Sequence, residues 1–392
     1  MKKGWEIKKL GEVCEFINGK AYKKEELLSN GKYPVLRVGN LFTSNQWYYS
    51  DLELDKDKYC ESGDLIYAWS ASFGPRIWIG EKVIYHYHIW KVVPNSKVIS
   101  KDFLFQLLEW DTQEIKSAYG TGATMMHVGK GSIEQRKVPI PPLPEQQRIV
   151  QLLDEAFEKI DTLKANAERN LQNAKELFES ALTEVLKPKE GWEEKKLSEI
   201  CNLKPQKNEI KNLLHENDIV TFLPMEDLGK EMKTIVPTKE KKLGEVYSSY
   251  TYFADNDVLL AKITPCFENG KVGIATNLIN GVGFGSSEYI VLRTLGNVIS
   301  EYVFYFVARK SFREEGRKLM SGAVGHKRVS KEWIDNYLIP FPKSLTEQQT
   351  IVEHLDALSA RCKALEINYQ KTIAQCDEMK KAVLAKAFNG EL

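Results

Sequence analysis

The longest regular pattern of apolar and polar positions runs from residue 145 to residue 186, directly after a proline-rich segment. Its apolar residues recur at alternating steps of four and three, with one irregular step, at Ile149, Leu153, Ala156, Ile160, Leu163, Ala167, Leu171, Ala174, Phe178, Ala181 and Val185. This spacing is the heptad seam of a coiled coil, and neither Gly nor Pro interrupts it. At 1.5 Å per residue it predicts a helix of about 60 Å, whose narrow apolar stripe requires a partner helix.

A second pattern of the same kind begins at residue 347. Its seam positions, polar only at Thr372, are Ile351, Leu355, Leu358, Cys362, Leu365, Tyr369, Thr372, Cys376, Met379 and Val383. The two patterns also open alike, because residues 145–154 and 347–356 agree at seven of ten positions. Two copies of one long helix indicate an internal duplication.

The duplication covers a whole half of the chain. Residues 4–14 (GWEIKKLGEVC) and 191–201 (GWEEKKLSEIC) agree at eight of eleven positions. Between each opening and its long helix, short β-rich runs alternate with turn residues and an apolar helical segment, so we predict an α+β fold. The two middle regions differ in sequence. The predicted boundaries are 1–144 for the first domain, 145–187 for the first helix, 188–344 for the second domain and 345–392 for the second helix.

Composition places the chain among folded proteins, since 392 residues with 43% apolar content allow two or three domains with cores of their own. We find no signal peptide and no run of eighteen apolar residues, which favours a cytoplasmic location. The net charge of +1 does not by itself indicate a nucleic-acid binder. The strongest basic run, residues 309–331, is typical of a solvated face. The six cysteines include no C-x-x-C pair and are expected to be small core residues.

No sequence motif predicts catalysis. His86 and His88 alternate on a predicted strand and would share one face, but no carboxylate or cysteine stands at ligand spacing nearby, so we favour a structural role over a metal site. The glycines at 281, 283 and 285 lack the following helix and the βαβ context of a nucleotide-binding loop. The sequence also lacks the motifs of P-loop enzymes, zinc proteases, serine hydrolases and base methyltransferases.

The remaining candidates lie in polar, aromatic and glycine-containing loops between strands. Such loops supply donors and acceptors for base edges: Lys and Arg suit phosphates and guanine, whereas Asn, Glu and Ser suit adenine and cytosine. For Phe73, Pro75, Pro265 and Phe267 we prefer a packing role. The candidate DNA-binding residues are Trp69, Ser70, Ser72, Arg76, His86, His88 and Lys130 in the first half and Lys262, Glu268, Asn269, Lys271, Ser286, Ser287, Glu288, Lys327 and Arg328 in the second.

Taken together, these features resemble the DNA-specificity subunit of Type I restriction-modification systems, over essentially the full length of the chain. The resemblance rests on the two G-W-x-x-K-K-L-x-E openings, the two joins of the I-P-x-P-x-x-x-E-Q-Q type, the paired helices and the C-terminal segment AFNGEL. Residues 69–74 and 263–271 also resemble two classes of target-recognition domain. The second join departs from the pattern by two extra residues.

The resemblance implies two target-recognition domains separated by two long antiparallel coiled-coil helices, in an internal pseudo-twofold repeat. Each domain would bind one half of a bipartite, asymmetric target in double-stranded DNA. The chain would be non-catalytic. Its partners would be two methyltransferase subunits and ATP-dependent restriction subunits, which would hold the cofactors S-adenosylmethionine, ATP and Mg. Two alternatives remain, a coiled-coil scaffold that does not read DNA and, less favoured, a self-contained DNA-modifying enzyme.

Overall fold

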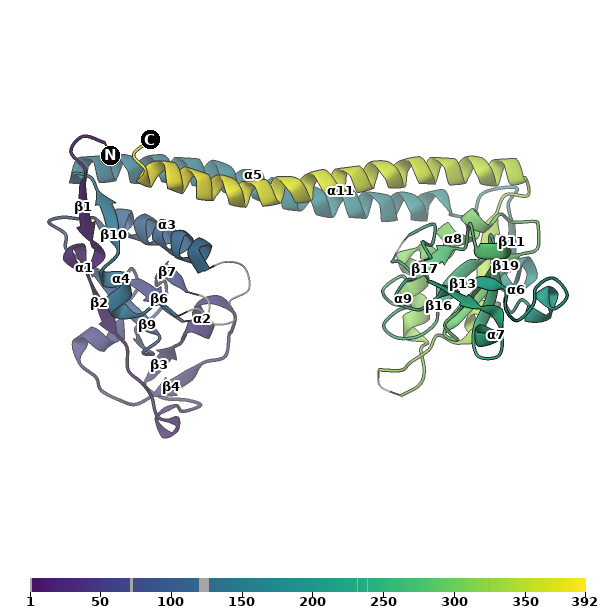
Figure 1. Cartoon of the computed structure of the whole chain (residues 1–392), viewed down its shortest axis with the longest axis horizontal. Coiled ribbons are helices and arrows are strands. Elements are labelled where there is room, and N and C mark those ends of the chain that lie inside the picture. Colours follow the sequence, from purple (N-terminus) through teal and green to yellow (C-terminus); the bar gives the residue numbers. More distant parts are fainter. Residues whose placement is uncertain (1, 71–72, 120–126, 231, 238, 324) are drawn as a thin grey trace. The chain divides into compact units, whose positions relative to one another are not determined.

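The computed structural model describes residues 2–70, 73–119, 127–230, 232–237, 239–323 and 325–392. The chain forms two compact units, and each is described by itself. Unit 1 comprises Met1–Glu168 and Gln370–Leu392, and unit 2 comprises Arg169–Tyr369. Each unit contains an α+β domain together with segments of two long helices, α5 (Leu143–Val185) and α11 (Leu345–Phe388) (Figure 1).

Unit 1 contains two four-stranded sheets, ordered β2-β9-β6-β7 and β4-β3-β8-β5, and the two-stranded sheet β1-β10. Neighbouring strands are antiparallel except β3 and β8. The strands are β1 (Glu6–Lys9), β2 (Cys14–Asn18), β3 (Tyr33–Leu36), β4 (Tyr48–Ser50), β5 (Tyr59–Cys60), β6 (Leu65–Ala68), β7 (Gly74–Ile77), β8 (Val83–Tyr85), β9 (Ile89–Pro94) and β10 (Lys137–Ile140). The helices are α1 (Leu10–Val13), α2 (Val38–Phe42), α3 (Lys101–Tyr119) and α4 (Lys130–Glu134), with 3-10 turns η1 (Lys24–Glu26) and η2 (Lys56–Lys58).

Unit 2 also contains two four-stranded sheets, ordered β12-β19-β16-β17 and β14-β13-β18-β15, and the two-stranded sheet β11-β20. Here the parallel pair is β13 and β18. The strands are β11 (Glu193–Lys196), β12 (Cys201–Asn202), β13 (Ile219–Leu223), β14 (Lys239–Lys242), β15 (Thr251–Ala254), β16 (Val258–Ala261), β17 (Val272–Ile274), β18 (Val282–Gly285), β19 (Tyr289–Thr294) and β20 (Leu338–Phe341). The helices are α6 (Leu197–Ile200), α7 (Leu243–Val246), α8 (Ser300–Ala308), α9 (Lys310–Lys318) and α10 (Lys331–Asp335), with 3-10 turns η3 (Lys207–Ile210) and η4 (Ile279–Gly281).

The two units repeat one topology strand by strand, because each strand of unit 1 has its counterpart ten numbers later in unit 2. The sequence predicts a shared frame around diverged middle regions, and the structure shows that these middle regions share their sheet order as well. Strand pairing depends on which positions alternate between the core and solvent, and not on residue identity. The duplication is therefore more complete in structure than in sequence.

The core of each unit includes parts of the long helices. In unit 1, residues of α1, β2, β6, β9 and α3 pack with the start of α5 and the end of α11. In unit 2, residues of β16, β19 and the almost fully buried α8 pack with the end of α5 and the start of α11. Neither helix is therefore a free-standing rod within its unit. All six cysteines belong to the described residues and are free thiols, and only Cys266 is not fully buried.

A buried glutamine holds the start of α5 against the domain of unit 1. The side chain of Gln146 is fully buried, and its amide donates to the carbonyls of Val98 at 2.8 Å and Pro141 at 2.9 Å. Its carbonyl accepts a bond from the backbone N–H of Ser100 at 2.9 Å. Three backbone groups of the turn before α3 and of the proline-rich join thus depend on one side chain.

Gln348 repeats this arrangement in unit 2. Its fully buried amide donates to the carbonyls of Asn297 at 3.0 Å and Pro342 at 2.8 Å, and its carbonyl accepts from the N–H of Ile299 at 3.0 Å. The repeated E-Q-Q motif therefore has a structural cause. Its first glutamine satisfies buried backbone groups that a shorter or apolar side chain would leave unpaired.

In unit 1, α5 and α11 run antiparallel as neighbours. Lys164 pairs with Asp377 at 2.7 Å, and Asp161 pairs with Lys380 at 2.5 Å, so the residue number falls along one helix as it rises along the other. This confirms the antiparallel pairing that the family resemblance implies. The exposed charges on both sides of the seam contribute little stability individually, so the pairing depends on the buried apolar positions.

The seam is narrower than the four-three pattern predicts. The fully buried positions in the middle of the helices recur about once per heptad, at Ile160, Ala167, Ala174, Cys362 and Cys376. Three predicted seam residues are covered less completely than the pattern predicts, because they are more than a third exposed: Leu163 (45%), Leu365 (39%) and Met379 (46%). Two helices alone cover only one side of each other, so the second apolar position of a heptad is left at the edge of the contact.

Candidate functional site

Three loops of unit 2 meet at one place. They are the β16–β17 loop, the β18–β19 loop and the segment before α10. The N–H of Lys262 donates to the carbonyl of Glu288 at 3.0 Å, and the N–H of Val329 donates to the carbonyl of Lys262 at 2.9 Å. A further bond joins the N–H of Thr264 to the carbonyl of Lys327 at 2.9 Å. These backbone bonds fix the three loops relative to one another and so position their side chains.

The side chains of Lys262, Glu288 and Arg328, which we call the ionic triad, converge on this junction. Arg328 donates to the Glu288 carboxylate through Nε at 2.9 Å and Nη2 at 2.6 Å. These bonds lower the pKa of Glu288 below its usual value, despite partial burial. Lys262 lies 4.0 Å from the same carboxylate and donates to the carbonyl of Ser287 at 2.9 Å. Two cations therefore share one anion on a half-exposed surface.

The equivalent three loops meet in unit 1, namely the β6–β7 loop, the β8–β9 loop and the segment before α4. The N–H of Trp69 donates to the carbonyl of His88 at 3.0 Å, and the N–H of Val128 donates to the carbonyl of Trp69 at 3.1 Å. A bridge joins Ser70 to His127, as one joins Ile263 to Arg328 in unit 2. Trp69, His88 and His127 therefore occupy the positions of the ionic triad, and we call them the aromatic triad.

The aromatic triad has a different chemistry. The ring of Trp69 lies edge-on to His88, with centroids 4.8 Å apart, and 5.9 Å from the ring of His127. His86 is 4.8 Å from His88, and burial, followed by His88 and Arg37, lowers its pKa to about 4. Burial, His127 and Arg37 also lower the pKa of His88. At neutral pH the two imidazoles are therefore uncharged and present one donor and one acceptor each.

The predicted arrangement of His86 and His88 is wrong in one respect. Strand β8 ends at Tyr85, and both histidines lie in the connection to β9, with the N–H of His88 3.4 Å from Nδ1 of His86. The rings are close because the chain turns there, and not because the residues alternate on a strand. Among the described residues, no cluster of three or more metal-ligating side chains occurs.

Two other candidates of unit 1, Arg76 and Lys130, have their partners outside the triad. Arg76 donates to Glu109 of α3 at 3.1 Å and stacks over the ring of Phe42 at 4.6 Å. Ser70 is buried. Lys130 is the first residue of α4 and lies 3.7 Å from Glu134. Ser72 and residues 120–126 lie outside the described residues.

The candidates of unit 2 divide in the same way. Lys271 donates to the carbonyls of Met225 at 2.6 Å and Glu226 at 3.3 Å, which holds its charge at the base of the β16–β17 loop. Ser286 accepts a bond from the N–H of Glu288 at 3.2 Å and so shapes the loop. The candidates with exposed side chains are Asn269, Ser287 and Lys327, whereas Glu268 is half-buried.

Sequence reasoning missed His127 and Tyr87. Tyr87 is exposed, its ring lies 3.9 Å from that of His88, and its carbonyl accepts a bond from the indole of Trp69 at 2.7 Å. A weak signal for His127 exists, because His-Val and Arg-Val dipeptides precede α4 and α10 at corresponding positions. A match of two residues is too short to identify His127 from the sequence alone, and it becomes clear only once the strands of the two units are paired.

The family described as "Type I restriction modification DNA specificity domain" matches residues 2–172 and 189–375. The chain belongs to this family. Among its relatives, the specificity subunit of the Type I restriction enzyme EcoEI from Escherichia coli is 38% identical over 178 residues, covering 45% of this chain and 29% of that subunit. The EcoKI specificity subunit from Escherichia coli K12 is 24% identical over 428 residues, covering 99% of this chain and 89% of that subunit.

Two solved structures share the fold over the whole chain. One, described as "Structural basis underlying complex assembly and conformational transition of the type I R-M system", aligns with a TM-score of 0.76 at 19% identity, covering 100% of this chain and 99% of the other. The HsdS subunit from Thermoanaerobacter tengcongensis aligns with a TM-score of 0.57 at 20% identity, covering 100% and 98%.

The match to the EcoEI and EcoAI subunits spans less than a third of their length, 29% in each case. Both halves of the chain match the DNA specificity domain of Type I systems, so the family assignment rests on the whole repeat and not on this partial match alone. No helix in the described part of the chain is long and apolar enough to cross a membrane.

Proposed function

We propose that this chain directs a Type I restriction-modification complex to a bipartite, asymmetric DNA target, with one half-site bound by each unit. The observation that supports this most is the three-loop junction, which is built by the same backbone bonds in both units but carries an ionic triad in one and an aromatic triad in the other. One scaffold with two different sets of side chains suits a target with two different half-sites.

The two triads suit different base edges. In the major groove, Arg328 or Lys262 would donate to O6 and N7 of guanine, and Glu288 would accept from N4 of cytosine. The aromatic triad offers the uncharged imidazole of His88, with one donor and one acceptor, beside an indole ring, which suits base edges and the apolar methyl group of thymine. We therefore expect the half-site of unit 2 to contain a G·C pair where the ionic triad makes contact.

The chemistry on DNA would belong to partner subunits. We propose that two methyltransferase subunits carrying S-adenosylmethionine, and restriction subunits using ATP and Mg, assemble with this chain in the cytoplasm. The family membership supports such partners, because its relatives are specificity subunits of restriction enzymes.

The exposed apolar residues of the long helices form the candidate docking surface for the methyltransferase subunits. Leu163 and Leu365 stand at equivalent positions of the helix repeat, 202 residues apart, and so do Leu177 (53% exposed) and Met379. Unit 1 thus presents Leu163 of α5 with Met379 of α11, and unit 2 presents Leu177 of α5 with Leu365 of α11. Equivalent uncovered apolar pairs on two repeats fit two copies of one partner.

Replacing Leu163 and Met379 together by Glu should remove one of two bound methyltransferase subunits. Each substitution loses about 1.5–3 kcal/mol of apolar burial and brings an unpaired charge into the contact. Native mass spectrometry of the co-expressed complex would show one methyltransferase per chain in place of two. A control variant, N173E with Q370E, changes two exposed polar residues of the same helices and should retain both. Retention of both copies by L163E/M379E would disprove this docking surface.

The length of α5 and α11 should set the spacing between the half-sites. Removing one heptad from the middle of each helix preserves the seam and shortens each by about 10 Å. We expect the unread spacer to shorten by about three base pairs, at about 3.4 Å per base pair, while both half-sites stay the same. Methylation mapping of the host genome, with the gene deleted, restored or carrying the shortened helices, measures this directly. If deleting the gene removed no methylated motif, the proposed function would be refuted. If shortening the helices altered either half-site, the spacing role would be refuted.

A further inference from the structure

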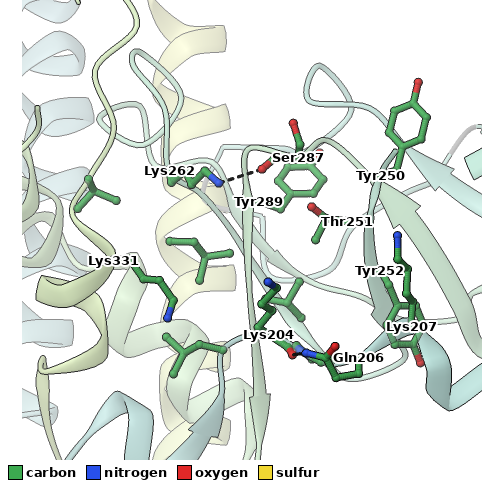
Figure 2. Close-up of a pocket in the computed structure, with 15 residues that line it drawn as sticks. Lys204, Gln206, Lys207, Tyr250, Thr251, Tyr252, Lys262, Ser287, Tyr289 and Lys331 are labelled. Atoms are coloured by element: carbon green, nitrogen blue, oxygen red, sulfur yellow. Dashed lines mark hydrogen bonds between the residues drawn. The ribbon is translucent and has the colours of Figure 1, made fainter. Parts of the chain in front are cut away.

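Unit 2 contains a cavity of about 570 Å³ beside the ionic triad. The segment after β12, the start of β15, the start of β19 and the start of α10 enclose it. Figure 2 shows Lys262 and Lys331 at one side, Lys207, Tyr250 and Tyr252 at the other, and Lys204 and Gln206 between them. Its volume lies within the range of about 300–1,000 Å³ that is typical of small-molecule sites.

The rim of the cavity is cationic. Lys204, Lys207, Lys262 and Lys331 line it, and none of its fifteen lining residues is Asp or Glu. Lys207 donates to the backbone carbonyls of Tyr247 and Ser248 and is held there. Lys204 is exposed, and Lys331 lies 3.2 Å from Asp335, so these two can turn toward a bound group. Lys262 and Lys331 have carboxylate partners outside the lining, Glu288 and Asp335, but lysines are the only charged residues that face the opening, which favours an anion there.

The inner wall is apolar and aromatic. Ile290, Val291 and Val329 are buried residues that line it. Tyr289 also contributes, and its hydroxyl group donates to the carbonyl of Pro224 at 3.0 Å, which leaves the ring as its contribution to the cavity. An inorganic anion would not need such a wall, and an apolar ligand would not need the lysines. The combination fits a planar ring that carries a phosphate group.

We propose that this cavity binds a single nucleotide, with its base on the apolar wall and its phosphate between Lys204 and Lys331. The nucleotide has two possible sources, a residue turned out of the DNA stack beside the unit 2 half-site, or a free nucleotide. Lys262 and Ser287 belong both to the cavity and to the triad loops, so a nucleotide leaving DNA bound there would enter directly. Binding of a nucleotide from DNA rests on the proposed function, whereas binding of a free nucleotide does not.

The first experiment titrates the full-length chain with deoxynucleoside 5′-monophosphates, using calorimetry and saturation-transfer NMR. We expect binding that weakens at least tenfold in K204Q/K331Q. The control K242Q/K318Q makes the same change in charge at exposed lysines that do not line the cavity, and should bind as the wild type does. Nucleosides without phosphate, and inorganic phosphate alone, should each bind more weakly than the monophosphates, because each engages only half of the cavity.

The second experiment uses the complex assembled with its methyltransferase subunits on target duplexes that carry 2-aminopurine at successive positions in and beside the unit 2 half-site. A fluorescence increase at one position, lost in K204Q/K331Q and kept in K242Q/K318Q, identifies DNA as the source. Monophosphate binding with no fluorescence change at any position identifies a free nucleotide, and this result stands even if genome mapping finds no bipartite motif. Absence of both signals, or equal behaviour of the two double variants, overturns the proposal.

Discussion

Replacing Gln146 by Ala should lower the free energy of unfolding of unit 1 by about 3 kcal/mol. The change removes three hydrogen bonds from a fully buried site and leaves two carbonyls and one N–H without partners. Each unpaired buried polar group costs about 1–3 kcal/mol, and partial access of water to the turn at Ser100 reduces the sum. Few single substitutions of a polar residue in this chain should cost as much.

The matched control for this prediction is the adjacent residue. Gln147 is exposed on the same helical turn, so Gln147→Ala should change the stability by less than about 0.5 kcal/mol. Urea unfolding of the full chain, with hydrogen exchange to locate the weakened segment, compares the two variants. Gln348→Ala should weaken unit 2 in the same way. If Gln146→Ala and Gln147→Ala gave the same unfolding curve, the buried amide would not be what fixes the helix to the domain.

The sequence predicts those parts of this fold that depend on local periodicity. Heptad spacing predicts both long helices, and α5 and α11 begin at Leu143 and Leu345, within two residues of the expected starts. The seam is less accurate, because periodicity shows which residues are apolar and not how much of each the partner helix covers. Leu163 and Met379 satisfy the pattern and yet remain nearly half exposed.

The sequence predicts the candidate site only in part. The sequence predicts that Trp69 and Lys262 both lie in loops, but nothing in it shows that they occupy one position of the repeat. Loops of different length separate the members of the two triads, so the spacing between equivalent residues changes from 193 for Trp69 and Lys262 to 201 for His127 and Arg328. The correspondence appears only when the strands are paired, because the backbone bonds that define it join segments far apart in the chain.

Replacing Glu288 by Ala should reduce methylation of the cognate target by about 5- to 150-fold, equivalent to about 1–3 kcal/mol for one base-edge contact. The same change frees Arg328 from its two bonds to the carboxylate, so base preference should relax at one position of the half-site that unit 2 binds. The half-site of unit 1 should stay unchanged, since its triad contains none of these residues. Replacing Trp69 by Ala should instead relax base preference in the half-site of unit 1 and leave the half-site of unit 2 unchanged.

Methylation of a randomised duplex library by the assembled complex measures both half-sites in one experiment. Glu314→Ala is the control, because Glu314 is an exposed acid on α9 whose partner Lys310 lies 3.7 Å away, outside the three-loop junction. A uniform loss across all sequences in E288A would indicate that Glu288 only holds Arg328 in place or supports the loop. Relaxation confined to one base pair requires that the ionic triad contact that base pair, and a matching change in W69A at the other half-site would assign each unit to its own half of the target.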